Sequence, residues 1–169
     1  MNRTDSARMV GLLEQTRWGA LATTGEEGPL ASMVACVPLP DLSGFVLHLS
    51  WLARHTGNLA ALPRASLVLS EPDPGTGDPQ TLARVTVSGA VESVARDDPR
   101  HAGLAAAYLA RLPSAEPLFG FGDFSVFVLR AEDVNYVGGF ARAYVLDAEG
   151  LAREVSRGRA ARAEGPQTA

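Results

Sequence analysis

Hydrophobic and polar positions alternate along much of this chain, as they do in strands that bury one face and expose the other. Residues 84–94 show the alternation best, because Val85, Val87 and Val91 share one face while polar side chains share the other. The segments are short and are bounded by Gly, Pro, Asp or Ser, which favours a strand-rich domain. The predicted strands span residues 18–24, 30–37, 45–50, 65–69, 84–94, 123–129 and 133–137, with a last strand over 140–146.

Three other segments follow a helical period. The first spans residues 5–17, where Asp5 or Ser6 provides a cap. A short helix begins at Arg54 and is stopped by a proline, and a third follows a capping aspartate at position 97 or 98. We therefore expect a few helices to flank the strands, which makes the fold class mainly β with flanking helices (α+β).

The turns indicate how the strands connect. Residues 25–28 and 38–44 are rich in Gly, Pro and Asp, so turns rather than helices join the first three strands. This favours an antiparallel barrel or sandwich over a doubly wound sheet. The length suits one domain with a real core. We predict a single domain over residues 1–150 with a barrel core over 18–146, and a frayed or loosely helical tail over 151–169.

Composition narrows the class of function. The formal net charge is −4, and the fifteen basic residues are all scattered arginines, which argues against nucleic acid as the main partner. No apolar run has the length that a membrane-spanning helix needs, and the N-terminus does not resemble a signal peptide, so we expect a cytoplasmic protein without a membrane partner. Cys36 is the only cysteine, and the three histidines are widely spaced, so no metal site is predicted.

A pair of basic residues marks the start of the short second helix. Arg54 and His55 follow the apolar strand that ends at Ser50. Free backbone N–H groups and the positive end of the helix dipole attract phosphate at such a place, and two basic side chains add charge. The alternative is a basic surface helix that connects two strands.

Several short motifs, in this order and at these spacings, resemble the FMN-binding split β-barrels related to pyridoxamine 5'-phosphate oxidase. The resemblance is closest to the branch that includes haem-utilisation proteins. It implies a split β-barrel that forms homodimers, with FMN bound at the subunit interface. The motifs are L-A-T at 21–23, G-P-L-A-S-M-V at 28–34, L-P-R-A-S-L at 62–67, A-R-V-T-V-S-G at 83–89 and V-G-G-F-A-R-A at 137–143.

The resemblance implies a cofactor site around the second helix. Arg54 and His55 match the positions where the oxidase family holds the FMN phosphate with Arg and Lys, so His55 is a departure. Ser32 is a second departure, because the oxidase has Arg there. Further implied contacts are Met33 and Val34, on the strand that meets the flavin, and Ser50, beside the flavin or its ribityl chain. The alternative for Met33 and Val34 is plain strand packing.

Two later segments complete the implied site. Arg84 matches a position that contacts FMN, usually through Gln; its alternative is a surface arginine paired with a carboxylate. Tyr136 and Phe140 fall near the flavin, and Arg142 falls near a substrate-binding arginine. Two glycines before Phe140 let the backbone bend. The alternative for this stretch is a β-bulge with an interface Phe and a surface Arg.

The predicted function is therefore that of an FMN-binding flavoprotein, an oxidoreductase that acts on a small, anionic organic substrate. No residue is an obvious general base, so the catalytic residues are unknown and the flavin would carry the chemistry. The alternative is a non-catalytic or haem-binding module, active in haem utilisation, on the same barrel, with haem as the cofactor. Fold alone does not decide between them.

Overall fold

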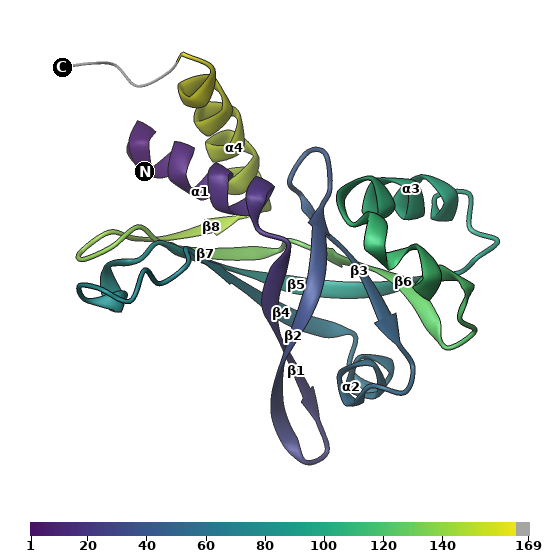
Figure 1. The fold of residues 1–169 in the computed structure, drawn as a ribbon. Coiled ribbons are helices and arrows are strands. Elements are labelled where there is room, and N and C mark those ends of the chain that lie inside the picture. The colour runs from purple at the N-terminus through teal and green to yellow at the C-terminus, as the bar shows by residue number, and fades with distance from the viewer. Residues whose placement is uncertain (165–169) are drawn as a thin grey trace.

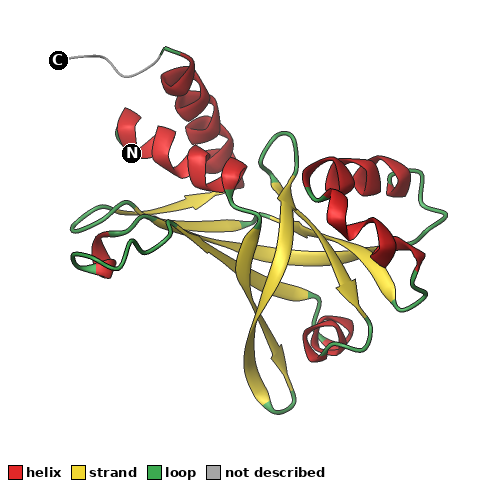
Figure 2. Ribbon diagram, viewed as in Figure 1, coloured by secondary structure: helices red, strands yellow, loops and turns green. Residues whose placement is uncertain are grey.

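The computed structural model describes residues 1–164, and its centre is an antiparallel sheet (Figures 1 and 2). The predicted alternation produces this sheet, because each strand turns its apolar residues to one side. The strands are β1 (Trp18–Gly25), β2 (Gly28–Pro38), β3 (Gly44–Ser50), β4 (Arg64–Ser70), β5 (Arg84–Val94), β6 (Phe124–Arg130), β7 (Asp133–Val137) and β8 (Ala143–Asp147).

The sheet closes on itself to form a barrel. Its strand order is β4-β1-β2-β3-β6-β5-β7-β8. A further pairing of β4 with β5 joins the two ends of the run β4-β1-β2-β3-β6-β5 and closes the barrel. β5 is long enough to pair with β4, β6 and β7 along its length. β7 and β8 therefore extend the sheet beyond the barrel. The predicted split-barrel fold of the mainly β class is confirmed.

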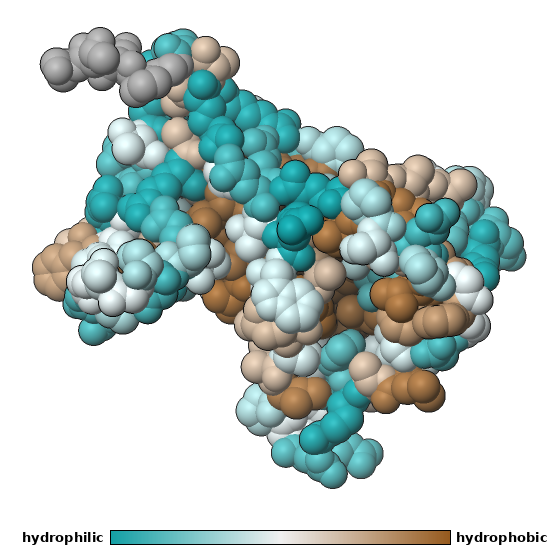
Figure 3. All heavy atoms as spheres, viewed as in Figure 1, coloured by the Kyte–Doolittle hydropathy of each residue, from teal (hydrophilic) through white to brown (hydrophobic). Residues whose placement is uncertain are grey.

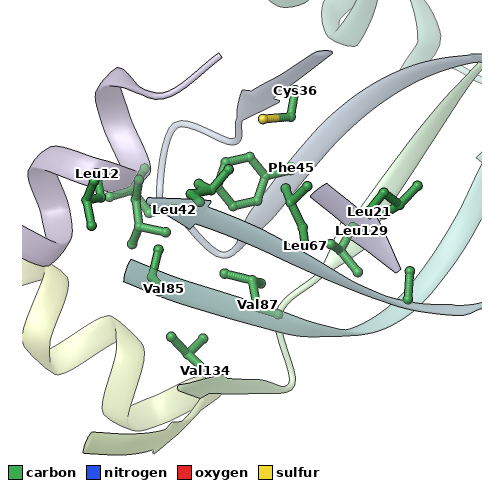
Figure 4. Close-up of a cluster of buried hydrophobic side chains, with 14 of the residues drawn as sticks. Leu12, Leu21, Cys36, Leu42, Phe45, Leu67, Val85, Val87, Leu129 and Val134 are labelled. Atoms are coloured by element: carbon green, nitrogen blue, oxygen red, sulfur yellow. The ribbon is translucent and has the colours of Figure 1, made fainter. Parts of the chain in front are cut away.

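The barrel interior is the main hydrophobic core. Leu21 of β1 lies opposite Leu67 of β4, which lies opposite Val87 of β5, and all three are almost completely buried. Figure 4 shows these side chains converging with Phe45 and Leu129 from the other side of the barrel. Since burying each such side chain contributes about 1.5–3 kcal/mol, this core accounts for most of the driving force for folding.

In the described residues 1–164, four α-helices flank the barrel. α1 (Arg3–Gln15) and α4 (Ala148–Ala163) pack side by side against the region of β7 and β8, and α2 (Arg54–Ala61) lies near the β1–β2 hairpin (Figure 1). α3 (His101–Arg111) and the 3-10 segment η2 (Pro113–Gly120) cover the outer face of β3 and β6. A short 3-10 turn, η1 (Pro79–Thr81), precedes β5.

The two ends of the chain differ from the sequence prediction. α1 spans residues 3–15 rather than 5–17, and Asn2 caps it by accepting a hydrogen bond from the Asp5 N–H at 2.8 Å. The tail is not frayed through residue 163, because Leu151 and Val155 of α4 are buried against the core. Asp147 caps α4 through the Gly150 N–H at 2.7 Å. Residues 165–169 of the predicted tail lie outside the described part.

The α3 start also differs from the prediction. The helix begins at His101, and Asp98 accepts a hydrogen bond from the Arg100 N–H outside the helix rather than capping its first turn. Beneath this helix, His48 of β3 stacks on Phe119 with ring centroids 3.8 Å apart. Tyr108 of α3 lies at the edge of the same imidazole. His48 is therefore part of the aromatic packing between β3 and the α3–η2 segment.

Candidate cofactor site

The start of α2 brings His55 and Ser32 together. Ser32 Oγ of β2 and His55 Nδ1 lie 3.0 Å apart in a hydrogen bond. The start of α2 is also tied to the end of β3, because the buried Thr56 hydroxyl donates a hydrogen bond to the Ser50 carbonyl oxygen at 2.7 Å. Burial lowers the pKa of His55, so the imidazole is neutral near pH 7. Ser32 thus engages Nδ1 of the imidazole, which leaves Nε2 as the second ring nitrogen.

The second basic residue of the pair is already engaged. Arg54 forms an ion pair with Glu27 in the β1–β2 turn, and both side chains are mostly exposed. A pocket of about 310 Å³ lies between that turn and α2. It is lined by Gly25, Glu26, Glu27, Gly28, Arg54, Gly57, Asn58 and Ala61. Two carboxylates and one guanidinium give it a negative formal charge, which does not favour a phosphate dianion.

Ser50 and Trp51 connect β3 to α2. The Ser50 hydroxyl donates to Asp123 Oδ2 at 2.6 Å and accepts the Leu52 N–H at 3.1 Å, so this side chain is engaged within the chain. Trp51 donates through Nε1 to Ser125 Oγ at 2.8 Å and remains half-exposed. Within residues 1–164, neither side chain hydrogen-bonds to His55, although both residues lie just before its helix.

Met33 and Val34 lie on opposite faces of β2. Val34 is buried in the barrel core, so only its backbone can meet a ligand from outside. Met33 is 49% exposed and lines a hollow of about 780 Å³ between α1, β1, β2 and the end of β4. Figure 3 shows hydrophobic atoms on the viewed face below the α1–α4 pair. This hollow is larger than the pocket between the β1–β2 turn and α2, and the sequence did not predict it.

A second group of predicted site residues lies at the β7–β8 loop. The Arg142 guanidinium pairs with Asp5 Oδ1 at 3.1 Å and donates to the Gly138 carbonyl oxygen at 2.6 Å. Asp5 is fully buried and also accepts from Asn2 Nδ2 at 2.9 Å and the Tyr144 hydroxyl at 3.1 Å. Arg142 therefore balances a buried charge, which the prediction of a substrate-side role did not anticipate.

The other predicted residues of this region lie in or beside the same loop. Tyr136 and Arg84 lie on the adjacent strands β7 and β5, and Phe140 lies within the loop. Tyr136 is fully buried, and within residues 1–164 its hydroxyl has no hydrogen-bond partner. Arg84 donates to the Gln80 carbonyl oxygen at 3.2 Å, at the start of β5. Phe140 is 91% exposed. Within residues 1–164, no hydrogen bond or ion pair joins this group to the Ser32–His55 pair or to Arg54.

Sequence reasoning missed two functional-site neighbours. Glu27 is recognisable only as an acidic residue in a turn, and its pairing with Arg54 depends on how the hairpin bends toward α2. Asp5 looked like a helix cap, but it is buried one turn inside the helix start. Among the described residues, no cluster of His, Cys, Asp or Glu could hold a metal ion by itself. None of the described helices has the length and apolar character to span a bilayer.

Comparison with known proteins places these features in a family. The family described as Pyridoxamine 5'-phosphate oxidase matches residues 6–138, which is most of the chain. A chloroplastic haem oxygenase of Arabidopsis thaliana, HOZ, is 37% identical over 134 residues, which cover 75% of this chain and 38% of that protein. The chain thus spans well under half the length of this curated relative.

Solved structures agree in fold. A haem-binding protein from Mycobacterium smegmatis is 34% identical and superposes with a TM-score of 0.78 over 90% of this chain and 62% of that one. The haem storage protein HutZ from Vibrio cholerae is 24% identical, with a TM-score of 0.66 over 74% of this chain and 88% of that one. A FAD-binding protein from Mesorhizobium loti, 18% identical, has a TM-score of 0.60 over 75% of this chain and 89% of that one.

Proposed function

The chain belongs to the pyridoxamine 5'-phosphate oxidase family, and from that starting point we propose that it binds haem at His55, in a site shared by two copies. The observation that carries the proposal is the hydrogen bond between Ser32 Oγ and His55 Nδ1. Histidines that bind a metal through one ring nitrogen are commonly held by a hydrogen bond at the other. A neutral imidazole with a held Nδ1 is suited to iron through Nε2.

The charges around α2 support haem over FMN. A neutral His55 contributes no positive charge, and Arg54 is balanced by Glu27 with Glu26 beside it. An FMN phosphate needs a net positive site, whereas haem iron needs a neutral imidazole as its ligand. The two relatives with more than 30% identity are named for haem as well.

In this proposal each residue has a limited task. His55 would ligate the iron, and Ser32 would orient the imidazole. When bound, haem supplies redox chemistry at iron. The residues of this chain bind and orient it, and those of a second copy exclude water from it.

The second copy is part of the proposal. The α2 group and the β7–β8 group are separate within one chain, although the family resemblance assigns both to one ligand. A homodimer in which one copy supplies His55 and its partner supplies the β7–β8 loop satisfies both. We propose a cytoplasmic homodimer of this kind.

FMN is the second candidate, because the backbone N–H groups at the start of α2 and the Arg54 side chain remain suited to an anion. In that case the protein is an oxidoreductase for a small anionic substrate. Arg142 is then a weak choice for substrate binding, since it already balances Asp5.

Parallel titrations of the purified full chain with haem and with FMN test the proposal. We expect a Soret band that saturates at one haem per site, and a shifted band with at least about tenfold weaker binding for His55→Ala. His101→Ala on α3 is the matched control and should bind haem like the wild type. Tight FMN binding with no saturable haem binding would replace this proposal with the flavoprotein.

A further inference from the structure

We propose that the segment between β5 and β6, which contains α3 and η2, is a cover that opens away from the outer face of β3 and β6 while the barrel stays closed. His48 of β3 holds this cover closed at neutral pH and releases it when the imidazole is protonated. The opening goes beyond the proposed function, because it involves neither haem nor the Ser32–His55 pair.

The cover is an insertion between two strands that are already neighbours. The last residues of β5 pair with β6, from Val91 opposite Leu129 to Val94 opposite Val126. The chain therefore leaves the sheet after Val94 and returns to it at Phe124, close to the point of departure. Figure 1 shows α3 beside β3 and β6, at one side of the barrel. Because the strand pairing does not pass through the insertion, the barrel can stay closed when the cover moves.

Little buried surface holds the cover in place. Across the described residues 101–120, Tyr108 is the only buried residue, whereas seven residues of α1 and five of α4 are buried. The cover packs on an apolar cluster that is separate from the core inside the barrel, and Val46, Val126 and Val128 supply the strand side of that cluster. Opening thus leaves the main core intact and costs less free energy than unfolding of the domain.

Two buried polar atoms without a hydrogen-bond partner lie on the two sides of this contact. They are Nδ1 of His48 on β3 and Nε of Arg111 on α3, and within residues 1–164 the Tyr136 hydroxyl is the one other such side-chain atom. A buried polar atom without a partner weakens the contact that buries it, because it has lost its hydrogen bonds to water. Opening returns both atoms to water. It breaks one hydrogen bond, from Arg111 Nη2 to the Glu14 carbonyl oxygen at 2.5 Å.

His48 contacts the cover through two aromatic rings. Its imidazole lies parallel to the Phe119 ring of η2, with ring centroids 3.8 Å apart and an angle of 7° between the planes. The Tyr108 ring of α3 meets the same imidazole at its edge, with centroids 5.8 Å apart. His48 is 8% exposed, so water reaches the whole imidazole only when the cover opens. The protonation state of His48 is therefore coupled to the position of the cover.

Protonation of His48 opposes closure. Burial, followed by the charges of His101 on α3 and Arg96 before it, lowers the pKa of His48 to about 4. Tyr108 is the other titratable group against the imidazole, and it is neutral because burial raises its pKa to about 12. η2 and β6 contribute only phenylalanine rings. In the open state the imidazole has its usual pKa near 6.5 and binds more protons, so the closed state is stable above pH 6.5 and is lost as the pH falls toward 4.

Hydrogen exchange of the full chain, read by mass spectrometry on peptic fragments, tests the opening. At pH 7 the α3 amides should be less protected than those of α1, α4 and the barrel strands. After correction for the intrinsic rates, α3 protection should fall at least about tenfold between pH 7 and pH 5, because the pKa of His48 differs by more than two units between the two states. Amides of β3 and β6 should stay protected. Exchange of α3 and the barrel strands at one common rate, or α3 protection that does not change with pH, would overturn the proposal.

Three variants test how His48 holds the cover. His48→Phe keeps an aromatic ring without a titratable nitrogen, so its α3 protection should not change between pH 7 and pH 5. Phe119→Ala removes the stacked ring and should lower α3 protection at pH 7 at least about tenfold. Phe121→Ala is the matched control, because Phe121 is 51% exposed and packs near Phe124. It should exchange within about twofold of the wild type.

The variants also give the outcomes that contradict the proposal. A pH response that persists in His48→Phe would remove His48 from the mechanism. Equal exchange in Phe119→Ala and Phe121→Ala would show that the stack does not hold the cover. Protected barrel amides in the same experiment report that each variant is folded. No readout here requires haem, so these results are independent of the haem and FMN titrations.

Discussion

Arg142 and Asp5, far apart in sequence, form an ion pair at 3.1 Å in which the carboxylate has no solvent exposure. The pair joins the β7–β8 loop to α1, and Tyr144 of β8 adds a hydrogen bond to the same carboxylate at 3.1 Å. Because a buried carboxylate is costly without its partners, this pair controls how the loop sits on the domain.

Arg142→Ala should therefore destabilise the protein. Removing the guanidinium leaves Asp5 with two neutral partners, Asn2 and Tyr144, and we expect a loss of roughly 1–3 kcal/mol in the free energy of unfolding. Urea unfolding followed by circular dichroism measures it. Arg153→Ala, which removes an exposed i,i+4 pair with Glu149, is the control and should change stability by less than about 0.5 kcal/mol. Equal effects in the two variants would contradict the prediction.

Stability should fall on acidification because of His48. Burial, with nearby His101 and Arg96, lowers the pKa of His48 to about 4, whereas the unfolded chain protonates near the usual 6.5. The unfolded state thus binds more protons between these values, so the stability present above pH 6.5 decreases as the pH falls toward 4. The loss is up to about 3 kcal/mol. His48→Phe should flatten this part of a stability–pH curve, and an unchanged curve in that variant would assign the effect elsewhere.

Cys36 should be inert in the folded protein. The thiol is fully buried in the barrel, and burial raises its pKa to about 12, so almost no thiolate is present at neutral pH. A thiol reagent should label one cysteine per chain in denaturant and none in native buffer over the same time. Rapid native labelling would mean that the barrel opens on that timescale.

The α1–α4 contact should not tolerate a side chain at Gly158. A Cβ there would lie 2.5 Å from the Ser6 carbonyl oxygen and 2.6 Å from Val10 Cγ2, so Gly158→Ala should push the helices apart and cost roughly 1–3 kcal/mol. Gly103→Ala in α3 is the matched control, because its Cβ meets nothing within 4 Å. That change should stabilise the protein by up to about 1 kcal/mol. Thermal melts of the two variants should move in opposite directions.

Local patterns predicted the elements better than their assembly. The alternation of Val85, Val87 and Val91 located β5, and β7 spans the predicted 133–137. Barrel closure through the β4–β5 pairing is a long-range property that no local pattern contains. α4 was predicted only as a frayed or loosely helical tail, because its buried stripe has few large apolar residues, chiefly Leu151 and Val155, in an Arg- and Ala-rich segment. The resemblance to a family provided the fold where local patterns left a barrel or a sandwich.

The candidate site was predictable in part. The sequence brought Arg54 and His55 to one helix start, and the resemblance added Ser32, which the structure places 3.0 Å from His55. The partners that change the chemistry come from distant segments: Glu27 offsets Arg54, and Asp5 engages Arg142. Such pairs depend on the closed barrel, so they follow from the fold rather than from residue spacing.

The packing of α1 against α4 also sets an order for folding during synthesis. Ser6 of α1 donates a hydrogen bond to Glu154 of α4 across 148 residues of sequence. The ribosome synthesises α1 well before α4, so the apolar stripe of α1 waits for one of its partners until α4 has also been made. A nascent chain stalled before α4 should hold its first helix loosely, and final docking of that helix should be a late, post-barrel step.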